Sequence, residues 1–231
     1  MRMVFVPGFS QTTASWSGVL AHLPLRSDAT AIEIPNAPTF EATADALATE
    51  AGPGLWIGYS MGGRLALAAA LRHPELVQAL VLVSATAGIE AAADRHARVI
   101  EDDARATDVE ARGVDAFLND WLTQPMFANV PPNAPGLNER RTLSPAHLAH
   151  QLRALGPGVM PSYWGRLHEL QIPVLLVSAT LDAKFDAVND RMATLIPAAQ
   201  LTRITGGHAL AQEAPGALAE AIIAFTQTIR S

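Results

Sequence analysis

The sequence predicts an α/β fold in which a mostly parallel sheet of about six strands is flanked by helices and carries a helical cap. The first observation is that short apolar runs rich in β-branched residues alternate with Ala/Leu-rich stretches of helical length, as in βαβ units. The second is that this alternation stops between about residues 88 and 170, where helical patterns and proline-rich loops occur without a convincing strand. We therefore expect an α/β core formed by residues 1–87 and 171–231, with residues 88–170 inserted between two core strands as the cap.

The elements follow from hydrophobic periodicity and from breakers such as Pro74, which stops the third helix just after Arg72 and His73. The expected strands are residues 3–6, 30–34, 55–58, 79–84, 173–178 and 200–204. The expected core helices are residues 16–23, 41–51, 61–72 and 216–229, and the expected cap helices are 91–106, 109–122 and 145–155.

Composition excludes several classes of function. Hydrophobic residues make up 49% of the 231 residues, enough for a sizeable core, and the net charge is −6 without a basic run, so we expect no nucleic-acid partner. Cysteine is absent, which excludes disulfides and thiolate metal sites. Pro7 and Gly8 interrupt the first apolar run, and no apolar stretch is long enough to span a bilayer, so we expect no membrane association and a cytoplasmic location.

Residues 58–63, which read GYSMGG, follow an expected strand and open an expected helix. This is the pattern G-x-S-x-G in the strand–turn–helix setting that places a serine nucleophile on a sharp turn. Glycines are needed there because strand and helix approach too closely for a Cβ atom. The turn also brings the serine hydroxyl to a helix N-terminus, where backbone N–H groups favour an anion. We therefore predict Ser60 as a nucleophile.

A serine nucleophile needs a general base, and the base needs an acid that orients it. Of the seven histidines, only His208 follows the last expected strand in a glycine-containing loop just before a helix. Asp182 lies in the loop after the preceding strand, whereas its rivals Asp186 and Asp190 lie deeper in what reads as the next helix. We predict that Ser60, His208 and Asp182 form a catalytic triad.

Negative charge that develops during catalysis needs two preorganised N–H donors. The backbone amide of Met61, directly after the nucleophile, is one candidate. Phe9, in the turn after the first strand, is the other, because Gly8 lets the chain approach closely. No cluster of His, Asp and Glu has metal-ligand spacing and no Gly-rich phosphate loop precedes a lysine, so we expect no metal and no cofactor.

Three features together resemble the α/β-hydrolase superfamily over nearly the whole chain. They are the sharp strand–turn–helix at Ser60 (the nucleophile elbow), Asp182 after a later strand, and Gly207-His208 after the last strand. A narrower resemblance is to the menaquinone-pathway synthases that make succinyl-hydroxycyclohexadiene carboxylate by eliminating pyruvate. It is carried by the elbow extended to Arg64, by Arg95-x-x-Arg98, by Trp121 with the QPMF run at 124–127, and by LDAKF at 181–185.

The narrower resemblance implies that Arg64, Arg98 and Arg140 bind substrate carboxylates. It also implies that Tyr59 and Trp121 line the pocket and that the triad abstracts a proton instead of hydrolysing an ester.

Independently of the resemblance, Arg64 lies four residues after Ser60, on the same helix face, and its guanidinium suits a carboxylate. We expect Arg64 and at least one of Arg98 and Arg140 to point into one cavity with Ser60, beneath a cap closed by Trp121. A solvated or ion-paired arginine is the alternative at the two cap positions.

The sequence leaves three functions open. The first is a reaction of a small carboxylate-bearing substrate, either pyruvate elimination or hydrolysis. The second is hydrolysis of small neutral esters, and the third is ligand binding without catalysis. The esterase alternative rests on departures from the narrower family. Pro7 precedes Gly8-Phe9 where histidine is usual, and Ala209 follows His208 where asparagine is usual. The binding alternative requires that Ser60 and His208 lie far apart. Each predicts a small-molecule ligand, and none specifies an oligomeric state.

Overall fold

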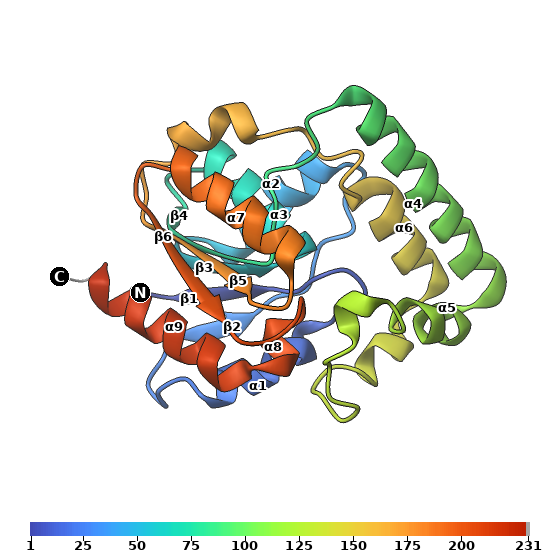
Figure 1. Cartoon of the computed structure of the whole chain (residues 1–231), viewed down its shortest axis with the longest axis horizontal. Helices are drawn as coiled ribbons and strands as arrows, with labels where there is room; N and C mark the ends of the chain where they lie inside the picture. The colour runs from blue at the N-terminus through green and yellow to red at the C-terminus, as the bar shows by residue number, and fades with distance from the viewer. Residues whose placement is uncertain (230–231) are drawn as a thin grey trace.

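In the computed structural model, which describes residues 1–229, six strands form one fully parallel sheet in the order β2-β1-β3-β4-β5-β6 (Figure 1). The strands are β1 (Met3–Val6), β2 (Ala29–Ala31), β3 (Gly54–Tyr59), β4 (Val77–Val83), β5 (Val174–Ala179) and β6 (Ala199–Ile204). The predicted fold class is confirmed. The predicted second strand was too long at its end, because its neighbour β1 ends at Val6 and the next residue, Pro7, has no N–H to continue the ladder.

Alternate residues along each strand face opposite sides of the sheet, and each side is covered by its own hydrophobic cluster. Val4 and Trp56 pack on the side of helices α2, α3 and α7, whereas Phe5 and Ile57 pack on the side of α1 and α9. The core helices are α1 (Ser17–Ala21), α2 (Phe40–Ala51), α3 (Met61–Arg72), α7 (Ala183–Leu195), α8 (Leu210–Glu213) and α9 (Pro215–Thr228). The sheet is therefore buried on both faces, as its continuous apolar strands predict.

Between β4 and β5 the described chain is helical, with α4 (Ala92–Arg112), α5 (Val114–Trp121) and α6 (Pro145–Leu155). Figure 1 shows these helices together beside one end of the sheet. The expected break between 106 and 109 is wrong: α4 continues to Gly113, whose φ of 82° ends the helix. Short 3-10 helices complete the described elements: Thr13–Trp16, Pro125–Phe127, Glu139–Thr142 and Trp164–Glu169.

The inserted segment does not pack as one unit. Helices α4, α5 and α6 share a cluster that includes Val109, Phe117 and Leu148. Tyr163 and Leu167, from the end of the segment, instead join the large core cluster. The layer over the end of the sheet is therefore formed by α4–α6. No helix in the described part of the chain is long and apolar enough to span a membrane.

The turn from β3 into α3 is the tightest junction of the fold. Ser60 has a φ of 50° and ψ of −108°, an unusual conformation for a residue with a side chain. A Cβ on Gly62 would collide with the carbonyl oxygens of Val6 and Pro7, and one on Gly58 would lie 2.5 Å from the Gly62 carbonyl oxygen. Only glycine lets the helix start this close to β1 and β3.

We expect Gly62→Ala to lower the free energy of unfolding by about 2–3 kcal/mol or more, because the clash is with backbone that cannot move aside. Urea denaturation of the purified variant measures the change. Gly165→Ala is the matched control, since its new Cβ meets nothing within 4 Å, and we expect a change within about 0.5 kcal/mol. Equal effects of the two substitutions would contradict this account of the turn.

Candidate active site

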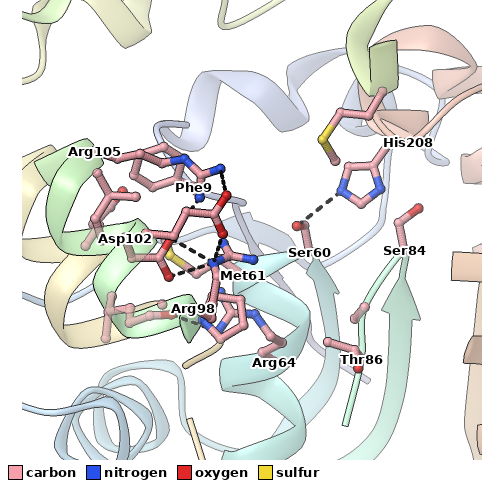
Figure 2. Close-up of a pocket in the computed structure, with 18 of the residues that line it drawn as sticks. Phe9, Ser60, Met61, Arg64, Ser84, Thr86, Arg98, Asp102, Arg105 and His208 are labelled. Atoms are coloured by element: carbon pink, nitrogen blue, oxygen red, sulfur yellow. Dashed lines mark hydrogen bonds and ion pairs between the residues drawn. The ribbon is translucent and has the colours of Figure 1, made fainter. Parts of the chain in front are cut away.

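Ser60, His208 and Asp182 form a hydrogen-bonded chain that starts at the turn between β3 and α3. His208 Nε2 lies 3.3 Å from Ser60 Oγ, as the dashed line in Figure 2 marks, and its Nδ1 lies 2.6 Å from Asp182 Oδ2. Because Nδ1 faces a carboxylate, it carries the ring proton and leaves Nε2 free to accept from the serine hydroxyl. His208 is only 2% exposed, so its ring is shielded from bulk water, whereas Ser60 and Asp182 are partly buried. These are the contacts that the predicted triad requires.

Separate elements hold the histidine and the aspartate in place. Asp182 caps helix α7, where its Oδ1 accepts from the Phe185 backbone N–H at 3.4 Å. The carboxylate of Glu213 accepts from the backbone N–H of Gly207 at 2.5 Å and from that of Ala209 at 3.0 Å. The loop is therefore fixed on both sides of His208.

The rival acids lie elsewhere. Asp186 accepts hydrogen bonds from Ser178 and Arg203, and Asp190 pairs with Arg203 as well. The hydrogen bonds from Ser178 and Arg203 hold the pKa of Asp186 below its usual value. Both carboxylates are engaged away from His208.

A cavity of about 340 Å³ opens above Ser60 (Figure 2). Phe9, Met61 and Trp121 line it together with Ser60 and His208. Within residues 1–229, the backbone N–H groups of Phe9 and Met61 have no hydrogen-bond partner. Both predicted oxyanion donors are thus at the cavity with unused N–H groups. No group of three or more His, Cys, Asp or Glu side chains in the described chain could hold a metal ion.

One wall of the cavity is strongly charged. Arg64, Arg98 and Arg105 lie there with the carboxylates of Glu101 and Asp102, and Lys184 also lines the cavity. Asp102, only 2% exposed, accepts from Arg98 Nε at 2.8 Å and from Arg105 Nη1 at 3.2 Å (Figure 2). The cations therefore outnumber the carboxylates, and the wall suits an anionic ligand.

Arg64 is the cavity's buried cation without a carboxylate partner in the described chain. Its Nη1 donates to the Leu155 carbonyl oxygen at 2.8 Å, and the residue is 7% exposed. Burial, with a further contribution from the charge of Arg98, lowers the pKa of Arg64 to about 9. The guanidinium is still charged at neutral pH, but its charge is costly until an anion approaches.

The structure does not bring Tyr59 and Arg140 to this cavity. Arg140 is 1% exposed, donates from Nη2 to Gln212 Oε1 at 2.7 Å, and has no partner for its Nε within the described residues. Burial lowers the pKa of Arg140 to about 10 and raises that of Tyr59. The Tyr59 ring lies behind His208, with the ring centroids 5.4 Å apart. The predicted shared cavity therefore contains Arg64, Arg98 and Trp121.

Sequence reasoning missed Asp102, Arg105, Gln151 and Glu213. Arg105 had a usable signal, because it lies seven residues after Arg98 and hence two turns along the same helix face. Gln151 and Glu213 had no such signal. Each accepts a hydrogen bond from a backbone N–H group, and the residue type alone does not indicate which N–H group it will contact.

A model of the alpha/beta hydrolase family matches residues 3–221. A putative 2-succinyl-6-hydroxy-2,4-cyclohexadiene-1-carboxylate synthase of Bacillus subtilis is 33% identical over 179 residues, which are 75% of this chain and 65% of that protein. The match thus spans just under two thirds of that relative's length.

Among solved structures, MenH from S. aureus has a TM-score of 0.92 and 27% identity, and the match covers 100% of this chain and 95% of that one. An esterase from Thermogutta terrifontis, solved with malate bound, has a TM-score of 0.78 at 21% identity over 100% of this chain and 91% of that one, a likeness of fold alone.

We expect the affinity of the cavity for succinate to fall as pH rises through 9. The pKa of Arg64 is about 9, so its positive charge is present below that pH and lost above it, and affinity should decline by up to about tenfold per pH unit. Calorimetric titration between pH 7 and 10 measures this. In Arg64→Met we expect weaker binding without that decline. An unchanged decline in this variant would assign the titration to another group.

Proposed function

Because the chain belongs to the alpha/beta hydrolase family, we propose that it is a serine enzyme in which Ser60, His208 and Asp182 act as a catalytic triad on a small, carboxylate-bearing substrate. The observation that carries the proposal is that one cavity contains both the Ser60–His208 contact and the guanidiniums of Arg64 and Arg98. The 3.3 Å contact also argues against a binding protein without catalysis, which would not need it.

The proposed chemistry begins with proton transfer. His208 Nε2 accepts a proton through Ser60 Oγ, and Asp182 stabilises the imidazolium that forms. The amides of Phe9 and Met61 donate hydrogen bonds to the oxygen on which negative charge develops. Trp121 and the rest of the α5 aromatics keep water away, which strengthens these electrostatic interactions.

We propose elimination of pyruvate as the reaction. The product named for the Bacillus relative carries two carboxylates, one on the ring and one on the succinyl group, and two unlike anionic groups suit a wall with several guanidiniums. In this reaction the triad removes a proton from carbon, the electron pair of that C–H bond forms a C=C bond, and the C–O bond to the three-carbon leaving group breaks. The leaving group departs as the enolate of pyruvate, which takes up the proton from His208 and becomes pyruvate. No water is consumed in this reaction.

Hydrolysis of small neutral esters is the second candidate. It is favoured by the pairing of Arg98 and Arg105 with Asp102, which already neutralises part of the charge on the cavity wall. In this reaction Ser60 Oγ would attack the ester carbonyl carbon, the alcohol would leave with the proton from His208, and water would then release the acid.

We expect Ser60→Ala to abolish covalent labelling by an alkyl fluorophosphonate, because the hydroxyl that attacks phosphorus is absent. Mass spectrometry of the intact protein measures the adduct. Ser84→Ala is the matched control, since Ser84 also lines the cavity with a φ of 47° but its hydroxyl has no described hydrogen-bond partner. Labelling of Ser60→Ala at the wild-type rate would end the proposal.

For the elimination reaction, we expect Arg98→Met to raise KM by about tenfold to a hundredfold, because a charge-assisted contact with a substrate carboxylate is lost. Pyruvate release, followed with a coupled dehydrogenase, measures it on the synthase substrate. Arg203→Met, which removes two ion pairs of a residue that does not line the cavity, should leave KM unchanged. Rapid turnover of nitrophenyl acetate without pyruvate release, unaffected by Arg98→Met, would favour the esterase.

A further inference from the structure

In the turn that contains Phe9, only one of three consecutive backbone N–H groups has no hydrogen-bond partner in the described chain. The Gly8 N–H donates to Gln11 Oε1 at 2.9 Å, and the Ser10 N–H donates to Gln151 Oε1 at 3.1 Å. The N–H of Phe9, between them, has no partner in the described chain, and Phe9 lines the cavity above Ser60. The neighbouring contacts therefore determine which amide stays available to a ligand.

The direction of the Phe9 N–H follows from its own peptide group. The Gly8 carbonyl oxygen accepts from the Gln11 N–H at 3.2 Å, so this carbonyl points into the turn. In a trans peptide the N–H points opposite to the carbonyl, so the Phe9 N–H points out of the turn. The hydrogen bond from the Ser10 N–H to Gln151 fixes the orientation of the next peptide group. Ser10 has a φ of 59°, a conformation that costs energy, and this hydrogen bond helps to stabilise it.

Gln151 is well suited to provide that support. It lies on helix α6, far from the turn in sequence, is 2% exposed and lines the same cavity. Its Nε2 donates to His147 Nε2 at 2.9 Å, which leaves Oε1 for Ser10 and determines the orientation of the amide. Burial, with the nearby charge of His150, lowers the pKa of His147 and so keeps its ring neutral and able to accept.

We propose that Gln151 is a positioning residue that aims the Phe9 N–H at the developing oxyanion, and so makes helix α6 part of the oxyanion hole. The inference rests on the proposed function, because it assumes that Phe9 is an oxyanion donor. A second contact from the same layer supports it. The Phe9 ring packs edge-on against Trp121 of α5, with centroids 5.0 Å apart. Backbone and side chain of the turn are thus both held by helices of the inserted segment.

The test compares Gln151→Met, Gln151→Glu and Arg153→Met with the wild type. Methionine keeps the volume of glutamine but accepts no hydrogen bond from Ser10. Glutamate retains that acceptor, and a protonated His147 can donate to it. Arg153→Met removes the ion pairs that join α6 to Asp103 and Glu110 of α4 on the outer face, and so controls for loosening of the helix.

The rate constant of inactivation by a neutral alkyl fluorophosphonate is measured, because its phosphoryl oxygen occupies the oxyanion position. Melting temperature and succinate affinity are measured in parallel. We expect Gln151→Met to react about tenfold to a hundredfold more slowly, with succinate affinity unchanged. We expect Gln151→Glu and Arg153→Met to react within about threefold of the wild-type rate.

Wild-type reactivity in a folded Gln151→Met variant would overturn the inference while leaving the proposed function intact. So would an equal loss in Gln151→Glu, because that variant retains the acceptor for Ser10. A wild-type protein that is not labelled at all would overturn the proposed function and this inference with it.

Discussion

The close packing of strand β3 against helix α3 at Ser60 is the contact on which the rest of the site depends. Glycines at 58 and 62 allow it, and it holds Ser60 at a positive φ that an unsupported chain would avoid. The Ser60 N–H donates to the Val83 carbonyl oxygen at 2.9 Å and its carbonyl accepts from the Arg64 N–H at 3.0 Å. One turn of backbone therefore presents a hydroxyl to His208 and a guanidinium to the same cavity.

Two buried arginines show that burial alone does not identify a ligand-binding cation. Arg64 and Arg140 both lack a carboxylate partner within residues 1–229, and burial lowers the pKa of each. Arg140, however, donates to Gln212 and faces protein, whereas Arg64 lines a cavity beside Arg98. Placing two like charges at one cavity costs stability unless a third charge compensates. Asp102 is shared between Arg98 and Arg105 and neutralises only part of their charge, so an anionic ligand would neutralise Arg64 together with what remains on Arg98.

The sequence predicted those parts of the molecule that depend on local pattern. Ser60 was evident from a six-residue motif between a strand and a helix, and His208 and Asp182 followed from their order along the strands. The end of α4 was missed although the sequence carries a signal for it, because Gly113 directly follows Arg112 and a glycine with positive φ commonly ends a helix. Contacts such as Gln151 to the Ser10 N–H join positions far apart in the chain, so they follow from packing and leave no local pattern.

The inserted helices do more than cover the cavity. They supply Arg98, Arg105 and Asp102 to its wall, and they hold the turn at Phe9 through both Trp121 and Gln151. If the proposed function holds, charge recognition and oxyanion stabilisation depend on the same helical layer. In the proposed function, the carboxylates of the substrate would therefore contact the same helices that hold the Phe9 turn, so binding energy from groups remote from the reacting carbon would help to keep that turn in place. Such coupling favours a multiply charged substrate over a neutral ester, because only the former has carboxylates that can contact the arginines of this layer.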